Sequence, residues 1–84
     1  MTVCHVLINS VEKALDFNKI ITSYDFDVDL VNGHTYVDAK SLVGIFSLPL
    51  YKPLELIVHS DEMEAEPLEE ELKPYRIEEI KISR

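Results

Sequence analysis

The fold of this chain is decided by the stretch Asp38-Ala39-Lys40-Ser41-Leu42-Val43-Gly44-Ile45-Phe46-Ser47-Leu48. Serine is a residue type that commonly caps the start of a helix, and the residues that follow Ser41 are mostly apolar. Pro49 stops the helix, which leaves room for only about two turns, and a helix this short depends on packing. The stretch therefore predicts a junction where a strand ends and a short apolar helix begins.

A β-hairpin is predicted immediately before this junction. Residues 25–30 alternate aspartate with Phe26, Val28 and Leu30, so these apolar side chains are expected to point inward. Asn32-Gly33 follows, a pair that tolerates positive φ in a tight turn, and residues 35–39 form the return strand.

The N-terminal part predicts a strand and an amphipathic helix. Residues 3–8 are rich in β-forming residues and end at Asn9-Ser10, which are both good helix N-caps. Apolar residues then recur at spacings of three and four, as on one face of a helix: Val11, Ala14, Phe17, Ile21 and Tyr24.

The C-terminal part predicts a last strand and a last helix. Residues 54–59 read as a strand, and Pro67 fits the first position of a helix that carries Leu68 and Leu72. The pattern of the tail, residues 75–84, fits neither helix nor strand, so its structure is left open.

These elements follow the order βαββαβα. The order predicts an α+β fold in a single domain, residues 1–84, with a four-stranded antiparallel sheet and three helices on one face. This architecture is an open-faced sandwich.

Charge and composition exclude several classes of function. Sixteen acidic against eight basic side chains give a net charge of -8, and no basic patch is visible, so we expect no nucleic-acid binding. The apolar runs are far shorter than the roughly 20 residues of a membrane span. No basic leader precedes an apolar segment, and the single Cys4 cannot form an internal disulfide, so we expect a cytoplasmic protein.

The chain resembles HPr, the small phosphocarrier of the bacterial phosphotransferase sugar-uptake system. The resemblance runs from about Tyr24 to His59 and rests on three motifs in addition to the order of the elements and the length. These are Tyr24-Asp25-x-Asp27-Val28, Asn32-Gly33 and Lys40-Ser41-Leu42-Val43-Gly44-Ile45-Phe46-Ser47-Leu48. The resemblance implies the HPr fold, with Ser41 as the regulatory serine of the family.

The first predicted helix departs from the family. HPr proteins place a histidine there, followed by Ala-Arg-Pro, and the histidine accepts the phosphoryl group. Counting back from the matched segment puts Ser10 at the histidine position, followed by Val11, Glu12 and Lys13. The acceptor is missing and an acid replaces the arginine, so we expect Ser10 to be a plain N-cap and do not expect ordinary phosphocarrier activity.

Ser41 is the best candidate for a functional residue. A phosphate on its hydroxyl would lie near the free N-H groups at the start of the short helix, and the resemblance implies a serine kinase that acts on it. The alternative is that Ser41 only caps the helix, which is worth about 1 kcal/mol.

A docking surface is implied by the same resemblance. Leu42, Val43 and Phe46 match positions that form an exposed apolar patch in the family, whereas Ile45 and Leu48 would face the core. The alternative is that all five are core residues of a small domain.

Catalytic and metal sites are not indicated. His5, His34 and His59 have no spacing that would chelate a metal, and the chain has no glycine-rich phosphate loop. We therefore expect no enzyme activity, no metal and no cofactor.

The favoured hypothesis is a bacterial HPr-like regulatory module, switched at Ser41, whose partners are a serine kinase, a transcription regulator or proteins of the phosphotransferase system. A second hypothesis is a phosphocarrier that uses a non-standard acceptor. A third is an unphosphorylated scaffold that adds its apolar tail, with Ile77, Ile80 and Ile82, to the sheet edge of a neighbour.

Overall fold

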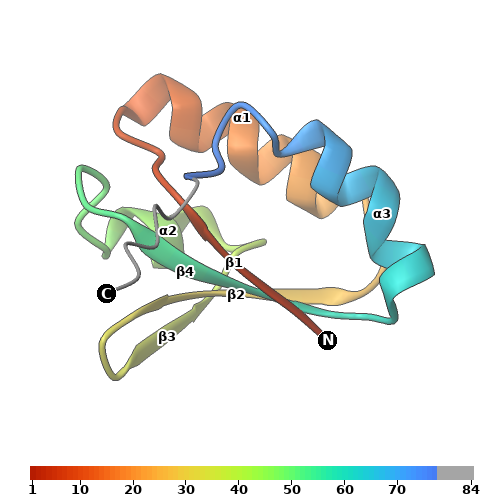
Figure 1. Cartoon of the computed structure of the whole chain (residues 1–84). Helices are drawn as coiled ribbons and strands as arrows, with labels where there is room; N and C mark the ends of the chain where they lie inside the picture. Colours follow the sequence, from red (N-terminus) through yellow and green to blue (C-terminus); the bar gives the residue numbers. More distant parts are fainter. Residues whose placement is uncertain (78–84) are drawn as a thin grey trace, which may run out of the picture.

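The computed structural model describes residues 1–77, and four strands of this part form one antiparallel sheet. The spatial order of the strands is β1-β4-β2-β3. Three helices complete the fold, so the predicted α+β architecture is confirmed (Figure 1). The elements are β1 Thr2–Val6, α1 Val11–Thr22, β2 Asp27–Asn32, β3 Thr35–Asp38, α2 Leu42–Phe46, β4 Leu54–His59 and α3 Glu62–Glu71.

The register of the two central strands places their apolar side chains on one face. Val28 pairs with Val58 and Leu30 pairs with Leu56, and all four side chains are buried. Residues one position away point to the other face because side chains alternate along a strand. The alternation seen in the sequence is therefore the pattern of strands that turn every second side chain toward the core, although Val31 on the other face is buried as well.

The helices cover this apolar face. Figure 1 shows α1 and α3 side by side above the sheet, and Ile45 of α2 joins the same buried core. Phe17 contributes the largest fully buried side chain, and its ring packs edge-on against the ring of Tyr75 with centroids 5.4 Å apart. The helical members of the core are Ala14, Phe17, Ile21, Ile45, Ala65 and Leu68.

The hairpin turn lies one residue later than predicted. Asn32 still pairs with Thr35 at the end of the ladder, so Gly33 and His34 form the two-residue loop. Only the glycine has positive φ, at 62°, as in a turn that needs glycine in its first central position. The prediction that Asn32 shares the turn with Gly33 was therefore wrong.

The start of α3 was also predicted wrongly. The helix begins at Glu62, and Pro67 lies inside it rather than at its first position. Asp61 is the N-cap, and its carboxylate accepts a hydrogen bond from the N-H of Glu64 at 2.8 Å. This cap satisfies a free N-H group at the helix start, and it offsets the one intrahelical bond that proline cannot donate.

The first part of the tail pairs with β1. The N-H of Leu7 donates to the carbonyl of Tyr75 at 2.8 Å, and the N-H of Ile77 donates to the carbonyl of His5 at 3.0 Å. Arg76 thereby forms an isolated antiparallel bridge with Val6. The tail residues Ile80 and Ile82 lie outside the described residues. Within residues 1–77, no helix is long and apolar enough to cross a membrane.

Candidate functional site

Ser41 is the N-cap of α2. Its hydroxyl oxygen accepts a hydrogen bond from the N-H of Gly44 at 3.1 Å, and its carbonyl accepts one from Ile45 at 2.9 Å. Its own N-H donates to the carbonyl of Asp38 at 2.9 Å, where β3 ends. The hydroxyl and carbonyl oxygens of Ser41 thus both accept hydrogen bonds from α2, and its side chain is half-buried. Ser41 therefore holds the end of β3 and the start of α2 together.

Two further residues shape this junction. The carboxylate of Asp38 accepts a hydrogen bond from the N-H of Lys40 at 2.9 Å, which closes the turn that precedes Ser41. Gly44 allows α2 to lie against β3, since a Cβ at this position would be 3.2 Å from the Cβ of Val37. The glycine is thus favoured by a close approach, since a larger residue would push Val37 by a few tenths of an ångström, and not by its dihedral angles.

The apolar residues of α2 divide between the surface and the core. Val43 is 81% exposed and Phe46 is 43% exposed, whereas Ile45 and Leu48 are buried. Leu42 is half-buried. The alternative that all five side chains belong to the core therefore does not hold for Val43 and Phe46. We refer to Leu42, Val43 and Phe46 as the α2 surface.

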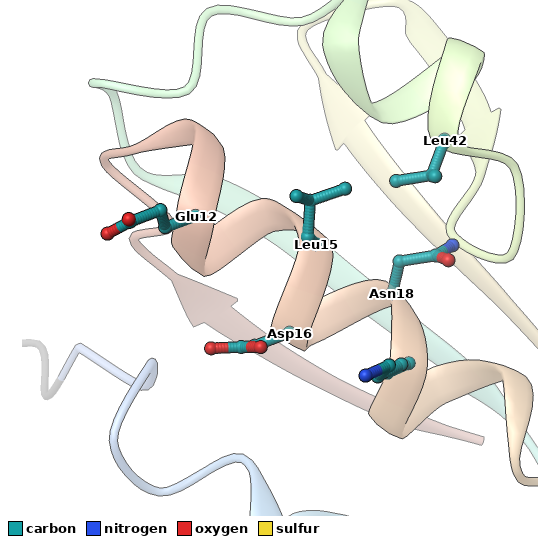
Figure 2. A pocket seen from close by; sticks show the side chains of 6 residues that line it. Glu12, Leu15, Asp16, Asn18 and Leu42 are labelled. Atoms are coloured by element: carbon teal, nitrogen blue, oxygen red, sulfur yellow. The ribbon is translucent and has the colours of Figure 1, made fainter.

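A groove of about 640 Å³ lies between α1 and α2. Figure 2 shows Leu15 of α1 and Leu42 of α2 pointing toward one another, with Asn18 beside them. The carboxylates of Glu12 and Asp16 point to the other side of α1. The groove is lined by Glu12, Leu15, Asp16, Asn18, Lys19 and Leu42.

Asn18 connects the two walls of this groove. Its side-chain amide donates a hydrogen bond to the carbonyl of Ala39 at 3.2 Å, across 21 positions of the sequence. The bond ties α1 to the segment that leads into α2, and it is the kind of contact that sequence periodicity does not reveal. Neither Asn18 nor Leu15 was among the residues predicted from the sequence.

The start of α1 contains Ser10 and Glu12, which were predicted from the sequence resemblance to stand at a degenerate phosphocarrier position. Ser10 is the N-cap, and its hydroxyl oxygen accepts a hydrogen bond from the N-H of Lys13 at 3.1 Å. Asn9 precedes it with φ of 70°, a conformation that Asn tolerates better than most residues, and its N-H donates to the carbonyl of Leu50 at 2.8 Å. Glu12 is exposed in the first helical turn. The local geometry is that of an ordinary capped helix.

Other chemically active side chains lie apart from this region. His59 contacts the carboxylate of Asp29 at 2.9 Å across two strands. Burial raises the pKa of the Cys4 thiol, which disfavours the reactive thiolate. Residues 1–77 contain no group of three or more His, Cys, Asp or Glu side chains that could bind a metal ion.

A scan against protein-family models finds no match, and a search of curated proteins finds none either. Solved structures do match. HPr-C-His from Thermoanaerobacter tengcongensis aligns with a TM-score of 0.70 and 22% identity, over 86% of this chain and 90% of that one. The fold is that of HPr.

A second HPr structure agrees with the first. The phosphocarrier protein HPr from Bacillus anthracis aligns with a TM-score of 0.70 and 19% identity, over 90% of this chain and 96% of that one. At these identities the likeness concerns the HPr fold, which supports the resemblance that the sequence motifs indicated.

Proposed function

We propose that this chain is an HPr-like binding module of bacterial regulation, related to the phosphotransferase system and without enzyme activity of its own. In this proposal the α2 surface docks a protein partner and Ser41 is the switch. One observation carries the proposal: on an HPr fold, the short helix that Ser41 caps carries two exposed apolar side chains, Val43 and Phe46.

The physical effect of phosphorylation supports this assignment. A phosphate on Ser41 would add about 1.5 to 2 negative charges beside the α2 surface. It would also place oxygen acceptors next to the first N-H groups of α2, which lack partners within the helix. A partner that docks on apolar side chains alone would meet a charged group after phosphorylation, whereas a partner with an arginine would gain a charged contact.

Phosphoryl transfer through α1 is disfavoured by its local geometry. Ser10 stands at the N-cap with its oxygen engaged by the N-H of Lys13, and Glu12 would repel a phosphoryl group nearby. We therefore propose regulation rather than carriage. We also propose that residues 1–84 form a single domain and that the protein is cytoplasmic. The single cysteine favours the cytoplasmic location, because it cannot form a disulfide within this chain.

The proposal is tested by incubating the protein with an HPr serine kinase and ATP. Mass spectrometry should show one added phosphate, and peptide mapping should place it on Ser41. Ser41→Ala should abolish the modification, whereas Ser47→Ala, at the other end of the same helix, should leave it intact. An unmodified Ser41 in the presence of an active kinase would contradict the switch.

The phosphocarrier alternative has its own test. Incubation with phosphoenolpyruvate and the first enzyme of the phosphotransferase relay should leave no acid-labile phosphate on His5, His34 or His59. Labelling of any of these histidines would support the carrier function instead.

A further inference from the structure

We propose that the face of the sheet opposite α1 and α3 is a separate interaction surface, which receives a cationic amphipathic helix of a partner protein. This open face carries the side chains at the odd-numbered positions of β1, β2 and β4 and at the even-numbered positions of β3. It shares no residue with the α2 surface, so the inference goes beyond the proposed switch at Ser41.

Val31 shows that the open face is partly apolar. Its side chain is only 4% exposed, yet it does not belong to the core that α1 and α3 cover (Figure 1), because it points to the other side of the sheet. Its direct neighbours on the open face are Tyr36 of β3 and Glu55 of β4.

An apolar stripe crosses all four strands of the open face. Val3 lies opposite Ile57, and Val31 lies opposite Tyr36. The two pairs meet between β4 and β2, where Ile57 and Val31 are diagonal neighbours. Val3 is 48% exposed and Tyr36 is 63% exposed, so both ends of the stripe are accessible. The stripe is about 16 Å long, which about 11 residues of a helix would cover.

Carboxylates lie on both sides of this stripe. Glu55 is next to Val31 in the register, whereas Asp29 is next to Ile57 and has Asp38 as its partner on β3. Residues that pair directly across two strands share a face of the sheet, so these carboxylates point to the same side as the stripe.

The open face has no lysine or arginine to balance these carboxylates. The four strands lie within the described residues, and their basic groups are the imidazoles of His5 and His59. The ring of His59 contacts Asp29 at 2.9 Å, and Asp27 is its direct partner in the register. The charges therefore favour a cationic partner, whereas a second copy of this chain would bring like charges together.

A helix is the element that fits this surface. α1 and α3 already cover the other face of the sheet (Figure 1), and helices on both faces of a sheet are one of the stable layer arrangements of proteins. An amphipathic helix has an apolar stripe with polar positions on both sides. Lysines or arginines at these positions would lie beside carboxylates on each side of the apolar stripe of the sheet.

The test adds two synthetic helical peptides of about 18 residues, or five turns, to the isotope-labelled full chain. Both peptides carry the same leucine stripe, and the flanking positions are lysine in one peptide and glutamate in the other. The lysine peptide should shift the NMR signals of the open face, including those of Val3, Ile57 and Tyr36. The glutamate peptide should bind at least about tenfold more weakly. Shifts confined to α1 and α2, or no binding of the lysine peptide, would overturn the proposal.

Matched substitutions separate the open face from general charge attraction. Asp27→Asn with Glu55→Gln should weaken binding of the lysine peptide by about threefold to tenfold, because two surface ion pairs are lost. Glu62→Gln with Glu66→Gln removes the same charge from α3, so the affinity should stay unchanged. An equal loss in both double variants would contradict the proposal, because the peptide would then be attracted only by net charge.

A second pair of variants tests the apolar stripe. Val3→Thr with Tyr36→Thr keeps residues that favour strands at both exposed positions, so the circular dichroism spectrum should stay unchanged. The lysine peptide should bind at least about fivefold more weakly to this double variant. Met63→Thr, at a position of α3 that is 86% exposed, should not change the affinity. Unchanged binding in the double variant would mean that the stripe is not the contact surface.

Two outcomes would assign the open face to another occupant and overturn the proposal. The first is a dimer in light scattering that Val3→Thr with Tyr36→Thr dissociates, which would identify a second copy of this chain. The second is binding of the lysine peptide only after Lys81→Glu with Arg84→Glu, which would identify residues 78–84 of the chain itself.

Discussion

Two residues of α2, two positions apart, should lose very different amounts of stability on substitution with alanine. Ile45 is fully buried, and replacing a buried isoleucine with alanine costs about 2–5 kcal/mol of unfolding free energy. Val43 is 81% exposed, so Val43→Ala removes little buried area. Alanine also has the better helix propensity, by up to about 0.7 kcal/mol. We expect Val43→Ala to change the unfolding free energy by no more than about 0.5 kcal/mol, or to raise it slightly.

Urea unfolding followed by circular dichroism measures this difference directly. A gap of at least about 1.5 kcal/mol between the two variants corresponds to a difference in Tm of at least about 6 °C for a domain of this size. If Ile45→Ala does not fold, Ile45→Val should still cost about 0.5–1.5 kcal/mol. Equal costs at the two positions would mean that α2 buries Val43, and the α2 surface could then not be a docking site.

Three other substitutions test a helix cap, a turn and a phenol. Ser41→Ala removes the acceptor for the N-H of Gly44 and should lower the unfolding free energy by about 1 kcal/mol in urea, whereas Ser41→Asn, which keeps a capping oxygen, should cost less. Gly33→Ala should cost about 1–2 kcal/mol in thermal unfolding, because φ is 62° there although nothing lies within 4 Å of the new Cβ. The hydrogen bond to Glu71 raises the pKa of Tyr24 to about 12, so the stability that this phenol contributes is present below pH 10 and lost between about pH 10 and 12. Absorbance titration should show that Tyr24→Phe removes a phenol with this high pKa, and a missing phenol that titrates near pH 10 would contradict the assignment.

The strands were predictable because their patterns are local. The alternation in residues 25–30 and the apolar run in residues 54–59 follow from a sheet with one covered face, and β4 has the predicted bounds Leu54–His59. The hairpin turn was misplaced by one residue because both Asn32 and Gly33 tolerate positive φ. In the structure Asn32 pairs with Thr35 of β3, which leaves Gly33 in the turn. This register depends on both strands and cannot be read from Asn32 or Gly33 alone.

The helix starts show how competing local signals are resolved. Pro67 is typical of a first helical position, but Asp61 and Glu64 have the spacing of a capping box, and the cap determined where α3 begins. The serine cap of α2 was predictable from sequence because it acts within one helical turn. Leu15 and Asn18 could not be found in this way, since their roles depend on how α1 packs against α2.

Ser10 and Ser41 have the same local geometry, so their surroundings must determine which of them can be a switch. Each accepts a hydrogen bond from the N-H three positions later at 3.1 Å. The first turn after Ser10 carries Glu12, whereas the first turn of α2 has no acidic residue. A phosphate on Ser10 would therefore meet a carboxylate, whereas a phosphate on Ser41 would meet none in the first turn of its helix. Because a carboxylate lies in the first turn after Ser10 but not in the first turn after Ser41, we expect a kinase to modify Ser41 in preference to Ser10.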